Sequence, residues 1–96
     1  MRICDVLTGP KKWTQETSAR DTCGDTVPVR SEYAVQFCIL GAICKAQGNL
    51  QEFIRDFQAV HEGLHPVFFN DKHTTTYEMV VEAVKKCGWW ERELGQ

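Results

Sequence analysis

The stretch from Ser31 to Gly48, SEYAVQFCILGAICKAQG, is the most apolar part of the chain. Serine commonly caps helix N-termini, and glycine commonly follows helix C-termini. The sequence therefore predicts a central helix over residues 32–47. Its apolar side chains surround the helix axis, so we expect it to be buried on most faces. A glycine inside a helix costs about 1 kcal/mol relative to alanine, and Gly41 therefore indicates close packing against another element.

A second helix is predicted to begin near residue 50. Asn49 and Glu52 match the capping box, in which two side chains each bind a free backbone N–H group. Apolar residues then recur at helical spacing, and Gly63 and Pro66 end the helix. The next segment, residues 66–73, is expected to be a connection whose Val67, Phe68 and Phe69 fill the core.

A third helix is predicted after this connection. Thr75 and Glu78 match the capping box again, and the apolar face that follows runs to Cys87. Gly88 then ends the helix. Residues 89–96 are expected to form a tail that is frayed from residue 91 onward.

Residues 1–30 are rich in turn formers. Residues 3–7 could form one or two helical turns before Gly9 and Pro10, and residues 21–25 predict a loop or a small hairpin. We therefore expect a mainly α protein with one domain over residues 1–96. It would be a bundle of three to four helices, with a turn-rich region at 1–30, a helical core at 31–88 and a tail at 89–96.

Composition excludes several classes of function. The 96 residues include 11 basic and 13 acidic side chains, and no run of Lys or Arg exceeds two. Direct nucleic-acid binding is therefore not expected, because it needs a basic surface. The cysteines are odd in number and contain no CxxC pair, which favours a reducing cytoplasm. The sequence shows neither a signal peptide nor the roughly 20 apolar residues of a membrane helix, so we expect a soluble cytoplasmic protein without membrane contact.

The string from His61 to His65, HEGLH, satisfies the HExxH pattern of zinc metallopeptidases. On a continuous helix the two histidines of this pattern bind Zn²⁺, and the glutamate, here Glu62, activates the metal-bound water. Gly63 and Pro66 argue against a continuous helix, and His61 falls on the apolar helix face. A histidine at the edge of the core with a backbone partner is therefore the simpler interpretation. The zinc enzyme remains an alternative. A structural zinc site of cysteines and histidines is a further alternative, although their spacing matches no ligand pattern, and no other cofactor is predicted.

The other reactive or polar side chains give weaker signals. Cys38 and Cys44 lie in the apolar stretch and are expected to be packing residues, because a buried thiol is inert. Cys23 is the cysteine expected to be most exposed, and none is predicted to be a nucleophile. Asn70 and Asp71 form either a turn or a polar binding spot beside the threonines that follow.

Three motifs occur in order along the chain. They are a W-x-Q element with Trp13 and Gln15, an F-C-x-x-G-A-I helix with Phe37, Cys38 and Gly41, and an F-N-D segment with Asn70 and Asp71. This order resembles a family of small uncharacterised phage and prophage proteins over roughly residues 3–87. The chain has Phe69 where the family often has tryptophan, and Thr75 where it often has a basic residue. Most of the motif positions are also core or turn positions, so the motifs could describe a fold rather than a site.

The resemblance implies a phage or mobile-element protein in the bacterial cytoplasm, without an assigned activity. We therefore expect a non-enzymatic protein that binds a host or defence protein, for example as an anti-CRISPR-like inhibitor. Trp89 and Trp90 either form an exposed pair or fold back on their own helix, and exposed tryptophans are common interaction anchors. The alternatives are the zinc enzyme and a self-associating structural protein, such as a homodimer. The candidate binding residues are Asn70, Asp71, Thr75, Trp89 and Trp90.

Overall fold

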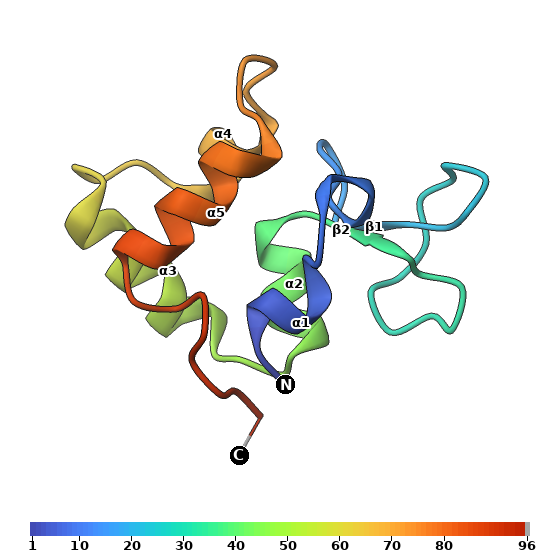
Figure 1. Cartoon of the computed structure of the whole chain (residues 1–96), viewed down its shortest axis with the longest axis horizontal. Coiled ribbons are helices and arrows are strands. Elements are labelled where there is room, and N and C mark those ends of the chain that lie inside the picture. Colours follow the sequence, from blue (N-terminus) through green and yellow to red (C-terminus); the bar gives the residue numbers. More distant parts are fainter. Residues whose placement is uncertain (96) are drawn as a thin grey trace.

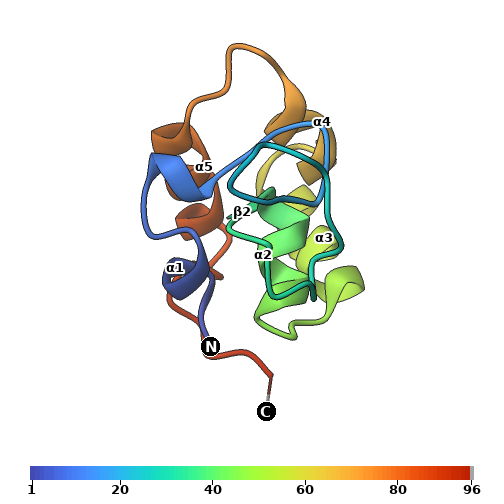
Figure 2. The same ribbon diagram turned by 90° about the vertical axis from the view of Figure 1, so that its right-hand side faces the viewer.

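Helix α2 (Ile39–Lys45) lies at the centre of the computed structural model, which describes residues 1–95 (Figure 1). It contacts α1 (Ile3–Val6), α3 (Leu50–Val60) and α4 (Pro66–Asp71). Figure 2 shows α1 and α5 (Tyr77–Lys86) on one side of the molecule, and α3 and α4 on the other side. The core therefore forms around α2, whose Ile39, Ala42 and Ile43 side chains are fully buried.

The predicted helix over residues 32–47 is wrong in its first half. Residues 36–37 form strand β2 (Gln36–Phe37), which pairs antiparallel with β1 (Ala19–Arg20). Ala19 lies opposite Phe37, and Arg20 lies opposite Gln36. The backbone of this segment thus finds its partners in a distant part of the chain. Ser31 is not the helix cap either, since its hydroxyl accepts a hydrogen bond from the Tyr33 N–H within a turn.

Helix α3 confirms the second predicted helix. The Asn49 side chain accepts a hydrogen bond from the Glu52 N–H (2.9 Å), as a helix cap does. Phe53 and Phe57, one turn apart, are fully buried. The helix ends at Val60, short of the expected Gly63.

The expected connection over residues 66–73 contains helix α4. Proline is favoured at the first helical position, where Pro66 stands, and His65 Nδ1 accepts a hydrogen bond from the Val67 N–H (3.1 Å). Phe69 packs on Phe57 with a ring separation of 5.8 Å. Phe68 was expected in the core, but its side chain is 74% exposed. Adjacent residues of a helix do not share a face, so the two rings point to different sides.

Helix α5 confirms the third predicted helix, but its cap is Thr76 rather than Thr75. The Thr76 hydroxyl accepts a hydrogen bond from the Met79 N–H (3.2 Å). The expected fraying after the helix is wrong for the described residues. Leu94 is buried, and its N–H donates to the Met1 carbonyl O (3.1 Å).

The mainly α class and the small single domain agree with the sequence prediction. The described residues contain five α-helices and a short 3-10 helix (Pro10–Lys12), where three to four helices were expected. The expected helical turns at residues 3–7 are α1. The loop or small hairpin expected at residues 21–25 is closed by an isolated antiparallel bridge between Arg20 and Thr26. The strand β1 pairs with β2 and not within this loop.

Candidate functional site

The Asn70 side chain is the point where the three sequence motifs meet. It is 1% exposed, and its Oδ1 accepts hydrogen bonds from Trp13 Nε1 (2.8 Å) and the Ile39 N–H (3.0 Å). Its Nδ2 donates to the Thr14 carbonyl O (3.2 Å) and to Asp71 Oδ1 (2.9 Å). All four hydrogen-bonding positions of the amide are therefore used inside the protein, and Asn70 does not present a free group to a ligand.

Gln15 and Asp71 extend this network. Gln15 Nε2 donates to the carbonyl O atoms of Asn70 (2.8 Å) and Lys72 (2.9 Å), and so satisfies acceptors at the end of α4. Asp71 Oδ1 accepts a hydrogen bond from the Glu16 N–H (2.9 Å). The W-x-Q and F-N-D motifs thus bind each other, and their side chains fix the first loop to α4.

The second motif brings α2 against the same loop. The Cys38 N–H donates to the Ser18 carbonyl O (3.2 Å), and Cys38 Sγ accepts from the Gly41 N–H (3.2 Å), which makes Cys38 the cap of α2. A Cβ on Gly41 would overlap the Ser18 carbonyl O, so only glycine fits here. The close packing expected at Gly41 is confirmed, and its partner is a loop.

The motif segments border a small cavity of about 170 Å³. Cys38, Asn70, Asp71 and Glu16 are among its lining residues. Burial raises the pKa of the Cys38 thiol, so the thiolate that acts as a nucleophile is disfavoured there. Burial likewise raises the pKa of the Cys87 thiol, to about 11. Cys23 is exposed, as expected.

Two of the remaining candidate binding residues point inward. Thr75 is 5% exposed, and its hydroxyl donates to the Phe69 carbonyl O (2.7 Å). Trp89 is 1% exposed, packs edge-on against Phe53 at 5.2 Å, and donates from Nε1 to Asp56 Oδ2 (2.9 Å). Of the two alternatives for the tryptophan pair, exposure is therefore wrong for Trp89, and folding back on the helices is confirmed for it. Trp90 is partly buried.

The HExxH string does not lie on one helix. His61 is the C-cap of α3 and His65 is the N-cap of α4, with Glu62 and Gly63 between them at positive φ. His61 Nε2 donates to the Ala83 carbonyl O (2.9 Å), which confirms a histidine at the core edge with a backbone partner. Among residues 1–95, no group of three or more His, Cys, Asp and Glu side chains is placed to hold a metal ion.

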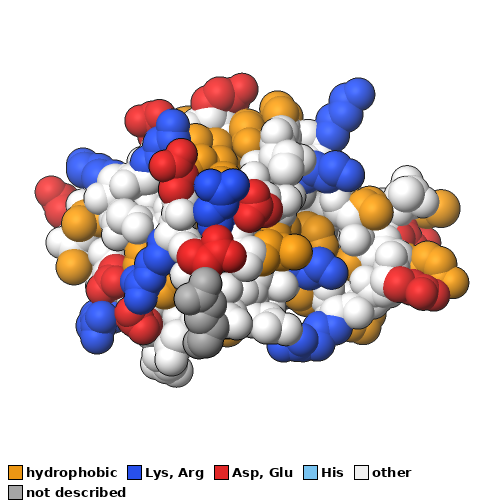
Figure 3. Space-filling model, turned by 60° about the horizontal axis from the view of Figure 1, so that its bottom comes forward, with side chains coloured by type: hydrophobic (Ala, Val, Ile, Leu, Met, Phe, Trp, Pro, Cys, Tyr) orange, Lys and Arg blue, Asp and Glu red, His pale blue; other side chains and the backbone are white. Residues whose placement is uncertain are grey.

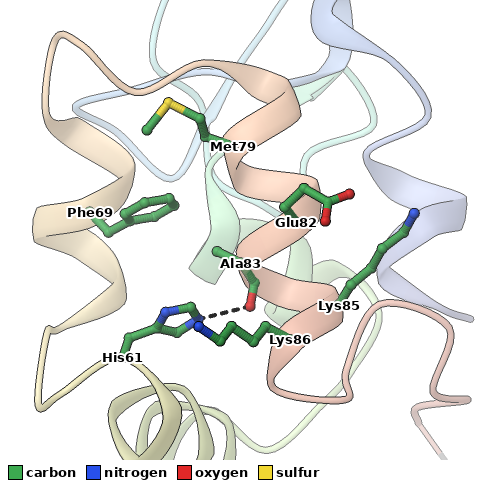
Figure 4. A pocket seen from close by; sticks show the side chains of 7 residues that line it. All are labelled: His61, Phe69, Met79, Glu82, Ala83, Lys85 and Lys86. Atoms are coloured by element: carbon green, nitrogen blue, oxygen red, sulfur yellow. Dashed lines mark hydrogen bonds between the residues drawn. The ribbon is translucent and has the colours of Figure 1, made fainter.

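A groove lies where α3, α4 and α5 meet (Figure 4). Its volume is about 570 Å³, which falls in the range of protein ligand sites. The His61 ring packs on Phe57 and lies beside Phe69, with ring centroids 4.2 Å and 6.4 Å away. The lining residues are His61, Phe69, Met79, Glu82, Ala83, Lys85 and Lys86.

Exposed large apolar side chains are concentrated in residues 60–79, a segment that also contributes His61, Phe69 and Met79 to the groove. Six large hydrophobic side chains are exposed in the described chain, and four of them come from residues 60–79. The exposure of Phe68 could have been found from the sequence only with α4 recognised as a helix, since Phe69 then faces the core and Phe68 does not. The four are Val60 (39%), Leu64 (41%), Phe68 (74%) and Met79 (43%).

Another face of the molecule carries many charged side chains. Figure 3 shows Lys and Arg side chains interspersed with Asp and Glu side chains on this face. Arg92 pairs with Glu52 at 2.8 Å, and the N-terminal amine pairs with Glu93 at 2.9 Å. Charges of both signs therefore lie close together near the two termini.

The fold and the Asn70 network define a small mainly α domain whose motif residues hold its segments together. Residues 2–88 match the family described as "Family of unknown function (DUF6197)", and the chain belongs to this family. This agrees with the expected membership of an uncharacterised family. No curated protein and no solved structure matches the chain. No helix in the described part has the length and apolar character needed to cross a membrane.

Proposed function

We propose that the chain is a non-enzymatic protein of phage or mobile-element origin that binds a host or defence protein in the bacterial cytoplasm. An anti-CRISPR-like inhibitor is one form of this function. The observation that carries the binding proposal is the exposure of Phe68, at 74%. Phe68 lies on α4, the helix that contributes Phe69 to the groove. Aromatic side chains are frequent anchors of protein interfaces. The proposed origin depends on the order of the three sequence motifs.

The rest of α4 is firmly held, which suits Phe68 to binding. Pro66 and Asn70 are buried on either side of it, and Phe69 packs on Phe57 and His61. The backbone that carries Phe68 is therefore fixed before a partner arrives. A preorganised anchor loses less conformational entropy on binding than a mobile one.

Partner capture tests this proposal. The tagged protein and its Phe68→Ala variant would be incubated with lysates of bacteria that carry a defence system, and captured proteins would be identified by mass spectrometry. Tyr33→Ala is the matched control, because Tyr33 is an aromatic residue of similar exposure, 67%, in a part of the chain that does not line the groove. We expect one host or defence protein to be captured by the wild type and by Tyr33→Ala, and to be lost with Phe68→Ala.

A second readout tests the anti-defence form. Expression of the wild type should raise the plating efficiency of a phage that the host defence system restricts, and Phe68→Ala should not. Equal capture by Phe68→Ala and the wild type would contradict Phe68 as the anchor. Capture of the chain only by itself, with a dimer mass in light scattering, would favour the self-associating alternative.

A further inference from the structure

The groove between α3, α4 and α5 has an apolar floor, and Lys86 lies along its edge (Figure 4). We propose that it takes a segment of the partner protein that carries a large apolar side chain next to a carboxylate. The apolar side chain would lie on Phe69 and Met79, and the carboxylate would pair with Lys86. This inference rests on the proposed protein-binding function and names the chemistry of the partner.

The floor of the groove is suited to an apolar side chain. The rings of His61 and Phe69 are nearly parallel, at 15°, and form one wall. The opposite wall is α5, which contributes Ala83 and the half-exposed Met79. Methionine adapts its shape to different apolar groups. Burying Phe69 and Met79 further would remove apolar surface from water, which favours association.

The position of Lys86 favours a carboxylate beside that side chain. In Figure 4 Lys86 extends along the groove toward His61, whereas Glu82 and Lys85, which also line the groove, point away from His61. Within the described residues neither Lys85 nor Lys86 takes part in an ion pair. The N–H group at His61 Nε2 already donates a hydrogen bond to the Ala83 carbonyl O. The cation that faces His61 across the groove is therefore the Lys86 amine, and its complement is an anion.

The chain offers a direct reporter for this groove. It contains two methionines, Met79 in the groove and Met1 at the N-terminus. Carbon-13 labelling of methionine methyl groups should therefore give an NMR signal for the groove and an internal control. The probes would be short synthetic peptides with a central Leu-Phe pair flanked by Glu, and the same peptides flanked by Lys. We expect the Glu-flanked peptide to shift the Met79 signal and to leave the Met1 signal unchanged.

Charge reversal tests the role of Lys86. Lys86→Glu should weaken binding of the Glu-flanked peptide about threefold to tenfold, as expected for an ion pair at a solvent-exposed edge. Lys45→Glu is the matched control, since it changes the net charge equally in the last turn of another helix and does not line the groove. We expect it to change the affinity less than about twofold. Both lysines are exposed, so both variants should fold, which circular dichroism would check.

The outcomes separate this inference from the proposed function. Absence of a Met79 shift, equal binding of the Lys-flanked peptide, or equal effects of the two lysine variants would overturn the groove proposal. Partner capture that depends on Phe68 would still stand in each of those cases. Conversely, peptide binding in the groove together with a failure to capture any partner would contradict the proposed function in cells.

Discussion

The side-chain amide of Asn70 joins the first loop, the start of α2 and the end of α4. Its replacement by alanine would leave the Trp13 Nε1–H and the Ile39 N–H without their acceptor in a buried place. Each unsatisfied buried group costs about 1–3 kcal/mol. We therefore expect Asn70→Ala to lower the free energy of unfolding by about 3–5 kcal/mol, measured by urea denaturation with circular dichroism.

Asn49 provides the matched control for this change. It is the only other asparagine in the chain, and its side chain caps α3 at an exposed position. Loss of a cap costs about 1 kcal/mol, so Asn49→Ala should be clearly milder than Asn70→Ala. If Asn70→Ala does not yield folded protein, Trp13→Phe removes one donor of the network and should cost about 1–2 kcal/mol. Equal stability of Asn70→Ala and the wild type would show that the network does not hold the fold.

The sequence predicted only part of the setting of these motif residues. Asn70 was assigned to a turn or a polar binding spot, but it lies within helix α4. The close packing expected at Gly41 was correct, because a glycine inside a helix has a cost that such packing offsets. The contact of Trp13 with Asn70 spans 57 residues of sequence. No local pattern encodes such a pairing, so the network appeared only in the structure.

Among the elements, α2 depends most on one residue. Gly41 lies against the Ser18 carbonyl O, where a Cβ has no room. Alanine normally favours a helix over glycine by about 1 kcal/mol, but here it would force α2 and the loop apart. We expect Gly41→Ala to destabilise the protein by about 2–4 kcal/mol, measured as a lowered midpoint of thermal unfolding.

Gly9 is the control for this substitution. It has extended backbone geometry, and a Cβ would meet no heavy atom within 4 Å. Gly9→Ala should therefore change the stability by less than about 1 kcal/mol. An increase in stability for Gly41→Ala would mean that helix propensity outweighs the contact with Ser18, against the packing described here.

The elements also show where sequence patterns succeed. Helices α3 and α5 were predicted because each carries a cap and an apolar face at helical spacing. Residues 32–38 were assigned to a helix because their apolar character is ambiguous between helix and buried strand. The pairing of β2 with β1 decided against the helix. The six-residue helix α4 is too short for a periodic pattern, and its Phe68 was therefore placed in the core.

On the scale of the whole molecule, the segment after α5 closes the fold. Its Trp89 covers Phe53 and binds Asp56 on α3, and its Leu94 pairs with the first residue of the chain. The two ends of the described chain therefore lie side by side (Figure 1). The sequence indicated that the tryptophan pair could fold back on its own helix. It contained no signal for the contact of Leu94 with Met1, because a polar segment with one apolar residue resembles a tail.

The contact between Trp89 and Asp56 makes this closure sensitive to acid. The hydrogen bond from Trp89, followed by the one from Arg55, lowers the pKa of the Asp56 carboxyl despite partial desolvation. A group whose pKa is lower in the folded state stabilises the fold above its unfolded pKa of about 4, and this contribution is lost as the pH falls through the folded value. We expect Asp56→Asn to reduce stability at pH 7 and to approach the wild type in acid.

Urea denaturation of both proteins from neutral pH to below pH 4 would measure this difference. The difference in unfolding free energy should be largest at neutral pH and should shrink below the ordinary aspartate pKa of about 4. Trp89→Phe is the matched control, because it keeps an aromatic ring against Phe53 and removes the indole donor. It should weaken the acid dependence in the same direction as Asp56→Asn. Parallel stability curves for the wild type and Asp56→Asn would show that Asp56 does not couple the terminal segment to α3, and closure would then depend on apolar packing of Trp89 and Leu94.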